Sequence, residues 1–371
     1  MKRIILLFFV CFFSLSLVAQ DLVTMNFGGQ SRKYLKYIPA SYSAQNPVPL
    51  VICLHGLGDN INNFKNIGMH LIGDTAGFIT IYPEAVNSMF GTAWNSGASY
   101  MGFILNSNID DVGFLMAIID SISAQYSINA QRIYFCGFSM GGFMSQRMAC
   151  EKSNNVAAIA SVAGTIGASL TCSPTRAVPV CHFHGTADSQ VSYSANQYGM
   201  NAEQMVRFWV QNNSCDTNYL FQTYPDIVND SISVESYYYN SQNHTADVMF
   251  YKAIGADHQW LYPPVNDIDY TVEIWKFLKK FQLVSQGLNE IKFNKDFLYP
   301  NPASNKIMIH RDLTINGFCT VEIQNIAGVT VKTCLLTTQN EINVSSLNEG
   351  YYTVKLTSND QIYTQKILIK K

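Results

Sequence analysis

The sequence predicts an α/β protein whose central sheet is mainly parallel, followed by a small all-β domain. Six continuous apolar runs alternate with helical segments, and strands that are buried on both faces of a parallel sheet have this apolar character. Beyond residue 297, short strand patterns separated by turn residues replace the helices, which is typical of a small β-sandwich. The chain of 371 residues, 48% of them apolar, is long enough for both parts.

Each apolar run takes a place in the predicted sheet. An edge strand is expected at residues 34–39, where a proline ends the run. The central strands are predicted at residues 48–55, 78–82, 133–136, 157–163, 178–184 and 248–254. The helices between and after them are predicted at residues 62–73, 110–122, 143–150, 196–209 and 271–281. Residues 214–243 form a polar, tyrosine-rich excursion with strand-like alternation at residues 233–239.

The first residues predict export from the cytoplasm. Lys2 and Arg3 precede an apolar run, and Ala19 offers a small residue for cleavage. This pattern is typical of a secretory signal peptide, and the run is too short for a membrane-spanning helix. The predicted organisation is a signal peptide at residues 1–20, a catalytic domain at 21–285, a polar linker at 286–296 and a β-domain at 297–371.

The charge balance excludes one class of partner. Only 13% of the residues are charged, and the formal net charge is −2. A protein that binds nucleic acid through a basic face has a different composition. We therefore expect no nucleic-acid partner.

The cysteines fall into two groups. Cys53, Cys136 and Cys181 lie inside apolar strand runs, so they are expected to be free and buried. Cys150 and Cys172 lie at a helix end and in a loop, and a disulfide between them is a hypothesis that an oxidising compartment permits. No C-x-x-C pair occurs, so no metal site is predicted.

A G-x-S-x-G motif at residues 137–141 is the strongest chemical signal in the chain. It follows the strand at residues 133–136 and precedes a helix, and strand, motif and helix together form a nucleophile elbow. Gly137 and Gly141 lack side chains, as so tight a turn requires, and Ser139 is predicted to be the nucleophile.

The expected partners of such a serine follow in the order acid, then histidine. Asp188 lies just past the strand at residues 178–184, and His258 lies in the loop after the strand at residues 248–254. Catalytic groups gather at the carboxyl ends of parallel strands. We therefore predict that Ser139, Asp188 and His258 form a catalytic triad.

Two further groups of residues complete the predicted site. The glycine-rich turn after the strand at residues 48–55 places the backbone amide of Leu57 as one oxyanion donor, and the amide of Met140 is the second. Trp94 and Trp260 are candidate substrate contacts, although Trp94 could equally anchor its loop to the core.

Several motifs resemble the secreted esterases that include polyhydroxybutyrate depolymerases, feruloyl esterases and acetylxylan esterases. They are L-H-G-L-G-D-N at residues 54–60, D-D-V-G-F at 110–114, R-I-Y-F-C-G-F-S-M-G-G at 132–142, H-F-H-G-T-A-D at 182–188 and H-Q-W at 258–260. The resemblance implies an α/β-hydrolase fold with Ser139, Asp188 and His258 as its triad. The family commonly has glycine directly before the histidine. Here that residue is Asp257, whose carboxylate is expected to face solvent.

The end of the chain resembles the C-terminal sorting domain of type IX secretion. The matching residues are Y-P-N-P-A at 299–303, G-Y-Y at 350–352 and Q-K-I-L at 365–368. The resemblance implies export through the periplasm by that machinery, to a secreted or cell-surface location.

The predicted function is therefore that of a secreted serine esterase that needs no metal and no organic cofactor. Feruloyl or acetyl esters on plant polysaccharide are the favoured substrates. The alternatives are a polyhydroxybutyrate or other short-chain polyester depolymerase, a serine peptidase of the same fold, and a non-catalytic surface protein that binds carbohydrate.

Overall fold

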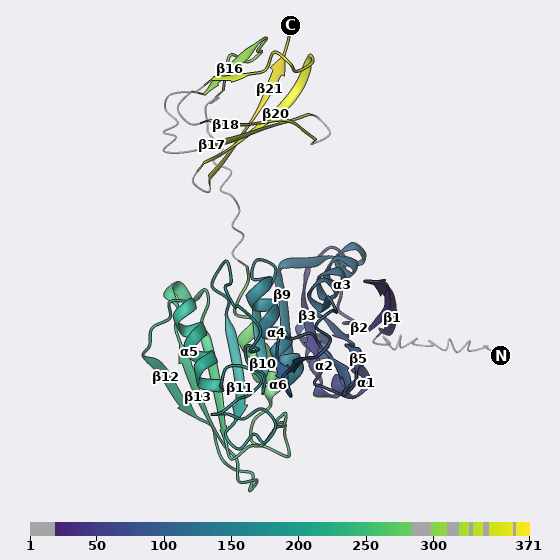
Figure 1. Ribbon diagram of the computed structural model, residues 1–371, viewed down its shortest axis with the longest axis vertical. Coiled ribbons are helices and arrows are strands. Elements are labelled where there is room, and N and C mark those ends of the chain that lie inside the picture. The colour runs from purple at the N-terminus through teal and green to yellow at the C-terminus, as the bar shows by residue number, and fades with distance from the viewer. Residues whose placement is uncertain (1–18, 284–297, 310–318, 326–328, 337–340, 359–360) are drawn as a thin grey trace, which may run out of the picture. The chain divides into compact units, whose positions relative to one another are not determined.

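The computed structural model describes residues 19–283, 298–309, 319–325, 329–336, 341–358 and 361–371 (Figure 1). Apart from Ala19 and Gln20, the predicted signal peptide lies outside these residues, as does the whole predicted linker at residues 286–296. The chain divides into two compact units, Met1–Leu283 and Val284–Lys371.

A ten-stranded sheet organises the first unit, in the order β1-β2-β4-β3-β9-β10-β11-β14-β13-β12. The six strands from β4 to β14 in this order run parallel, and antiparallel pairs close both edges. The strands are β1 (Ala19–Phe27), β2 (Gln30–Ile38), β3 (Val48–Leu54), β4 (Ile79–Pro83), β9 (Ile128–Phe138), β10 (Ala158–Val162), β11 (Val180–Gly185), β12 (Tyr219–Thr223), β13 (Ser233–Tyr239) and β14 (Val248–Ile254). The prediction of a mainly parallel central sheet is confirmed.

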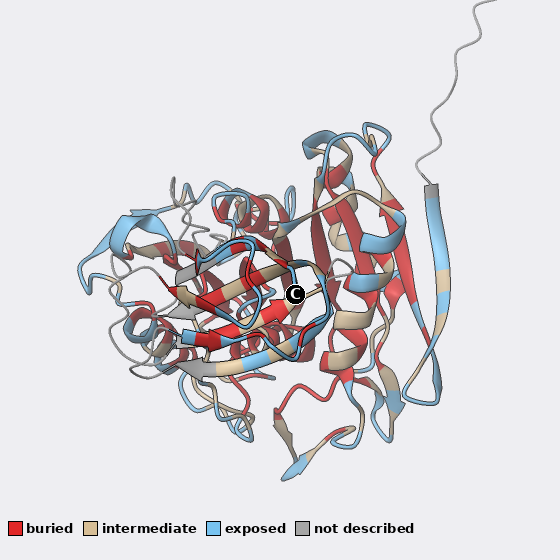
Figure 2. Ribbon diagram, turned by 90° about the horizontal axis from the view of Figure 1, so that it is seen from above, coloured by how far each residue is buried: buried red, intermediate tan, exposed pale blue. Residues whose placement is uncertain are grey.

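Helices cover both faces of this sheet (Figure 1). One core lies between the sheet and α3 (Asp111–Gln125), α4 (Met140–Glu151) and α5 (Ala202–Asn212). The other core lies between the sheet and α1 (Ile61–Phe64), α2 (Met69–Ala76) and α6 (Tyr270–Leu278). Strands β3, β4, β10 and β11 are buried along almost their whole length because both faces are covered, whereas β1 has no fully buried residue among those described (Figure 2).

Three predicted elements differ from the structure. The run at residues 34–39 is not an edge, because β2 pairs with both β1 and β4. The edge strand β1 begins where the signal peptide was predicted to end, which hid it in the sequence. The helix predicted at residues 62–73 is broken at Gly68, whose φ of 80° ends one helical turn and begins α2. The helix predicted at residues 196–209 begins only after Asn201, which caps α5.

Short elements complete the first unit. The hairpins β5 (Val86–Ser88) with β6 (Gly91–Ala93), and β7 (Ser99–Tyr100) with β8 (Phe103–Ile104), lie in the connection between β4 and α3. Single 3-10 turns occur at η1 (Lys65–Ile67) and η2 (Gln242–His244). Within the described residues, none of the helices combines the length and the apolar character that a membrane crossing requires.

The second unit consists of two antiparallel sheets around one apolar core, as the predicted β-sandwich requires. The first sheet contains β15 (Leu298–Tyr299), β16 (Lys306–Ile309) and β19 (Glu341–Asn343). The second contains β18 (Thr330–Leu336), β17 (Cys319–Gln324), β20 (Gly350–Ser358) and β21 (Gln361–Ile369).

The cysteine predictions are confirmed. A disulfide joins Cys150, near the end of α4, to Cys172 in the loop that follows β10. Cys53, Cys136 and Cys181 are free and buried.

Candidate active site

Ser139 lies on a strained turn between β9 and α4. Its φ of 53° and ψ of −121° fall outside the regions that a side chain normally allows. The turn closes tightly around it, because a Cβ on Gly137 would lie 2.3 Å from the carbonyl carbon of Gly141, and a Cβ on Gly141 would lie 2.0 Å from the oxygen of Leu54. The two flanking glycines therefore permit the sharp turn that exposes a nucleophile.

Asp188 and His258 meet across two neighbouring loops. His258 Nδ1 lies 2.9 Å from Asp188 Oδ2 and 3.1 Å from Oδ1. The backbone amides of Gln190 and Val191 donate to Asp188 Oδ1 at 2.9 and 2.8 Å, which fixes the carboxylate in its loop. An imidazole that donates Nδ1–H to a fixed carboxylate presents Nε2 as a base.

The predicted nucleophile, base and oxyanion donors line one cavity. It has a volume of about 490 Å³, and its lining includes Ser139, His258, Leu57 and Met140. No hydrogen bond joins Ser139 Oγ to His258 among the described residues, and such bonds often tighten only when substrate is bound. The structure thus brings the predicted nucleophile, base and oxyanion donors to a single cavity.

His55 holds the loop that carries Leu57. Its Nδ1 lies 2.7 Å from the carbonyl oxygen of Gly56, and its Nε2 accepts from the amide of Ala85 at 3.1 Å. Nδ1 therefore carries the proton, and burial lowers the pKa of this imidazole, so the ring is neutral. His55 is therefore a structural support for the loop that carries Leu57, the predicted oxyanion donor.

Neither tryptophan that the sequence offered as a substrate contact lines the cavity. Trp94 is 1% exposed, and its indole donates to the carbonyl oxygen of His55 at 2.9 Å, so it anchors the loop. Trp260 does not line the cavity. Its indole donates to Thr271 Oγ1 at 3.1 Å, and its ring packs behind Phe138. The aromatic rings that do line the cavity include Tyr100, Phe138 and Tyr198, which short loop motifs did not reveal.

Asp257 does more than face solvent. Its carboxylate is exposed, but Oδ1 accepts from the amide of Ser189 at 2.8 Å and from the amide of His258 at 2.7 Å. These bonds, with that from Ser189 the larger, lower the pKa of Asp257. The side chain therefore ties the loop of Asp188 to the loop of His258.

A chain of buried hydrogen bonds begins beneath α5. Trp209 Nε1 can only donate, and it donates to Gln146 Oε1 at 2.7 Å. This fixes the amide so that Gln146 Nε2 donates to Ser161 Oγ at 2.8 Å. Ser161 Oγ in turn lies 2.8 Å from Nδ1 of the buried His182, to which it donates its hydroxyl hydrogen.

This chain of hydrogen bonds ends next to Asp188. His182 Nε2 lies 3.1 Å from His184 Nδ1, and His184 Nε2 lies 2.7 Å from the carbonyl oxygen of Val191, which can only accept. The carbonyl oxygen thus fixes a proton on His184 Nε2. Burial lowers the pKa of both imidazoles, which favours neutral rings in which His182 Nε2 donates to His184 Nδ1. His184 Nε2 also lies 3.5 Å from Asp188 Oδ2, the oxygen that His258 Nδ1 contacts at 2.9 Å.

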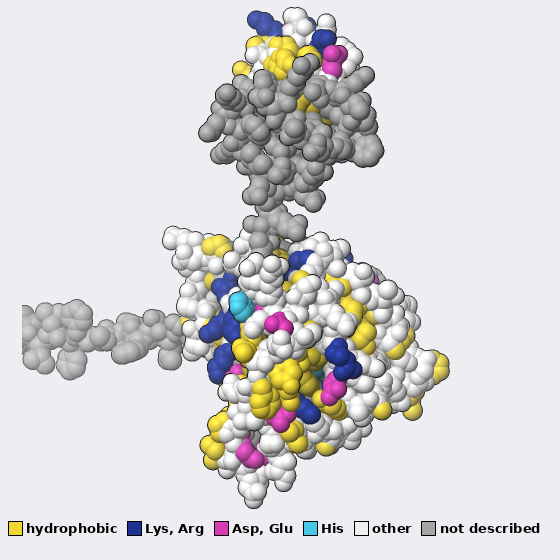
Figure 3. Space-filling view, turned by 90° about the vertical axis from the view of Figure 1, so that its left-hand side faces the viewer, with side chains coloured by type: hydrophobic (Ala, Val, Ile, Leu, Met, Phe, Trp, Pro, Cys, Tyr) yellow, Lys and Arg dark blue, Asp and Glu magenta, His cyan; other side chains and the backbone are white. Residues whose placement is uncertain are grey.

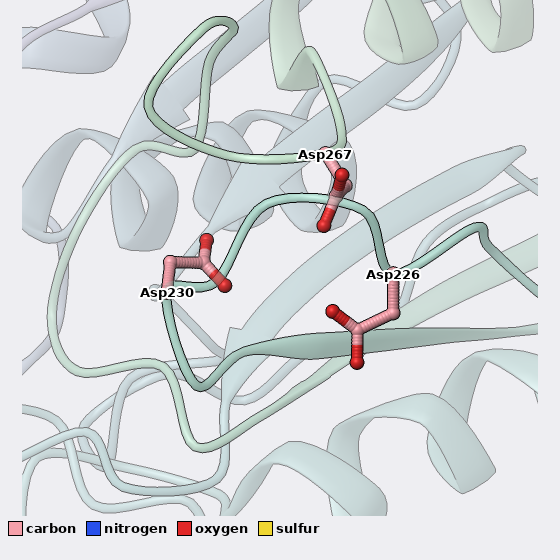
Figure 4. Close-up of side chains that lie close together, drawn as sticks. All are labelled: Asp226, Asp230 and Asp267. Atoms are coloured by element: carbon pink, nitrogen blue, oxygen red, sulfur yellow. The ribbon is translucent and has the colours of Figure 1, made fainter.

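Three carboxylates outside the cavity lie close together. Those of Asp226, Asp230 and Asp267 place oxygen atoms within 4.8 Å of one another (Figure 4). Asp267 accepts from the amides of Ile227 and Val228, and Asp230 accepts from the side chain of Asn266 at 2.8 Å. These bonds between two loops account for the cluster, so we assign no metal to it.

Comparison with protein families decides the relationship. Residues 40–234, which include Ser139 and Asp188, match the family described as Phospholipase/Carboxylesterase. The chain belongs to the phospholipase/carboxylesterase family. Residues 297–370 match the family described as Secretion system C-terminal sorting domain. Both predicted resemblances are confirmed, and the first unit is an α/β-hydrolase.

The relatives of this family member are ester hydrolases. This chain is 30% identical over 169 residues to the bifunctional acetylxylan esterase/xylanase XynS20E of Neocallimastix patriciarum. The aligned region covers 44% of this chain and 22% of that protein. The chain is 26% identical over 200 residues to feruloyl esterase B of Piromyces equi, covering 50% of this chain and 36% of that protein. It is 28% identical over 144 residues to poly(3-hydroxyalkanoate) depolymerase C of Paucimonas lemoignei, covering 38% and 33%. The chain thus spans about a third or less of the length of these three relatives.

Proposed function

We propose that this phospholipase/carboxylesterase family member is a serine esterase that hydrolyses carboxylic esters through an acyl-enzyme. The observation that carries the proposal is the 2.9 Å contact between His258 Nδ1 and Asp188 Oδ2. The same histidine lines one cavity with Ser139, whose φ is positive. No side chain other than these is needed as nucleophile, base or orienting acid.

The reaction follows from these positions. His258 Nε2 removes the proton of Ser139 Oγ as this oxygen attacks the ester carbonyl carbon. The backbone amides of Leu57 and Met140 stabilise the oxyanion, and each such donor contributes roughly 100- to 1,000-fold to the rate. The imidazolium then protonates the leaving alkoxide. Water, deprotonated by His258, releases the acid, and Asp188 keeps the imidazole in the required tautomer throughout.

Feruloyl or acetyl esters on plant polysaccharide are the proposed substrates. The acetylxylan and feruloyl esterases among the relatives favour them. The rings of Tyr100 and Tyr198, which line the cavity, stack at 5.9 Å with an angle of 11° between them and offer apolar surface for an acyl group. A polyester such as polyhydroxybutyrate is the second candidate, favoured by the depolymerase among the relatives.

Export is part of the proposal. The match to a C-terminal sorting domain supports delivery by the type IX machinery to the cell surface or the medium. We propose that residues 21–285 form the catalytic domain and that residues 297–371 are the address that this machinery reads.

The test compares initial rates of the full chain on methyl ferulate, acetylated xylan and a polyhydroxybutyrate suspension. Ser139→Ala should lower kcat by about 10⁴- to 10⁶-fold on the accepted substrate. Ser189→Ala is the matched control, because this second serine lines the same cavity and should retain most of the activity. Full activity of Ser139→Ala, or loss of activity only in Ser189→Ala, would contradict the proposal.

A further inference from the structure

A second cleft lies between α5 and the β12–β13 hairpin. It has a volume of about 200 Å³ and shares no lining residue with the catalytic cavity. Four tyrosines line it: Tyr193, Tyr219, Tyr237 and Tyr239. Figure 3 shows hydrophobic side chains gathered on this face of the molecule, with basic and acidic side chains at their border. The proposed ester hydrolysis uses none of these residues.

Sheet register explains why the rings are uncovered. Tyr219 pairs with Tyr239, and Tyr237 pairs with Phe250, so alternate residues of β12, β13 and β14 place their rings on one face. Val206 of α5 is buried near Phe250, but every residue of β12 is exposed. The helix therefore covers the sheet as far as β14 and leaves the tyrosines beyond it open.

The rings are held in place without a ligand. Tyr219 packs edge-on against Tyr237 and Tyr239, at centroid distances of 5.0 and 5.5 Å. The hydroxyl of Tyr237 donates to Glu235 at 2.6 Å, and that of Tyr193 donates to Glu203 at 3.0 Å. Binding on rings that are already fixed loses little side-chain entropy.

The charges in and beside the cleft are balanced. Glu203 pairs with Arg207 at 3.5 Å, and Lys252 Nζ lies 5.7 Å from the centre of the Tyr193 ring. With Glu235, the two carboxylates and two cations sum to zero, so the cleft selects neither an anion nor a cation. It offers both donors and acceptors around apolar ring surface.

We propose that this tyrosine cleft binds a neutral polysaccharide chain at a distance from the ester-cleaving cavity. A sugar ring has an apolar C–H face that packs on an aromatic ring, and hydroxyls at its edge that both donate and accept hydrogen bonds. The fixed tyrosine rings can pack on the C–H face of the sugar. The side chains of Glu203, Arg207 and Lys252 can form hydrogen bonds with its hydroxyls. Val206 is the one Val, Leu or Ile side chain in the lining, so the apolar surface of the cleft is almost wholly aromatic and suits the C–H face of a sugar ring.

Retention on soluble arabinoxylan in affinity electrophoresis tests the proposal. The full chain carries Ser139→Ala, so binding is measured without hydrolysis. Tyr219→Ala and Tyr237→Ala should each weaken binding at least about tenfold, whereas Tyr219→Phe should retain it. Tyr262→Ala is the control, because Tyr262 is 52% exposed and lies outside the cleft. Unchanged tryptophan fluorescence shows that each variant is folded.

The outcomes separate this inference from the proposed esterase function. In the chain with Ser139 intact, Tyr219→Ala should keep its rate on methyl ferulate and lose rate on acetylated xylan. Retention on arabinoxylan by a chain that shows no esterase activity would support binding at the cleft and contradict the proposed esterase function. Three results would overturn the proposal that the cleft binds polysaccharide. They are no retention of the full chain, retention that Tyr219→Ala and Tyr237→Ala leave unchanged, and stronger retention on anionic polygalacturonate. A dimer in sedimentation that Tyr219→Ala abolishes would also overturn it, because a second copy would then occupy the site.

Discussion

At the scale of single residues, Asp257 shows how one carboxylate can organise two loops. It accepts from the amides of Ser189 and His258, which belong to the loops that carry the acid and the base. The distance between Asp188 and His258 depends on both loops, so we expect this side chain to affect catalysis without touching the reacting atoms.

Asp257→Ala should lower kcat by about tenfold, since it removes the acceptor shared by the two amides. Asp257→Asn keeps a side-chain oxygen and should recover most of the rate, while KM changes little in either variant. The measurement is kcat and KM on a soluble ester, with Gln259→Ala as a control at the exposed position after the histidine. Equal losses in the alanine and asparagine variants would show that the bridge has no positioning role.

At the scale of elements, a buried ion pair connects β2 to the start of α3. Arg32 Nη2 lies 2.7 Å from Asp111 Oδ1, and Asp111 Oδ2 accepts from the amide of Asn95 at 2.7 Å. The guanidinium also lies 3.8 Å above the ring of Phe114. Asp111 thereby fixes the loop of Trp94, which in turn contacts the oxyanion loop through His55.

Asp111→Ala should lower the free energy of unfolding by about 3–5 kcal/mol, because it leaves a buried guanidinium without its partner. Urea unfolding followed by tryptophan fluorescence measures this, since the tryptophans Trp94, Trp209, Trp260 and Trp275 all lie in the first unit. The exposed ion pair of Arg207 and Glu203 is the control, and Arg207→Ala should lower the free energy of unfolding by less than about 1 kcal/mol. Similar costs for the two pairs would contradict the structural role of Asp111.

The disulfide acts on the element that follows the nucleophile. Cys150 lies near the end of α4, and the bridge closes a sequence separation of 22 residues. Cys172→Ser should cost about 3 kcal/mol by the loop-closure relation, read by the same unfolding experiment. Cys215→Ser is the control, because Cys215 is free and half-buried, and a cost equal to that of Cys172→Ser would contradict the expectation.

The sequence predicts much of the site because each proposed catalytic residue directly follows a strand with a readable apolar run. Ser139 follows β9, Asp188 follows β11 and His258 follows β14, and these strands lie almost side by side in a parallel sheet. The order of residues along the chain therefore becomes proximity at one edge of the sheet. Their catalytic roles remain a prediction.

The supporting contacts could not be predicted, because their partners lie far apart in the chain. Arg32 and Asp111 are 79 residues apart, and Ser189 and Asp257 are 68 apart. The two roles of Trp94 stayed open for a similar reason, since the backbone carbonyl that accepts from its indole belongs to a residue 39 positions earlier. No periodicity or motif signals such pairs, which the fold alone creates.

At the scale of the whole molecule, the buried histidines make stability depend on pH. Burial lowers the pKa of His182 and His184 in the folded state, whereas the unfolded chain has the ordinary value of 6.5. The folded protein then binds fewer protons than the unfolded chain. The two histidines therefore make their full contribution to the free energy of unfolding above about pH 6.5. This contribution is lost as the pH falls from 6.5 toward the lowered pKa.

Unfolding of the first unit should therefore become easier between pH 7 and pH 5, by up to about 2 kcal/mol for each histidine that stays neutral. His182→Gln should reduce this slope, because the ionisable ring is gone. His244→Gln is the control, since the side chain of His244 is 67% exposed. A slope that His182→Gln leaves unaltered would rule out the buried ring as its source.

Covalent labelling of the full chain with an alkyl fluorophosphonate decides whether Ser139 is the nucleophile. Intact mass should show a single adduct, and peptide mapping should place it on Ser139. The adduct should be absent in Ser139→Ala and form slowly in His258→Ala, because the imidazole activates the hydroxyl. Labelling on another residue, or undiminished labelling of Ser139→Ala, would contradict the assignment of Ser139, Asp188 and His258 as the catalytic triad.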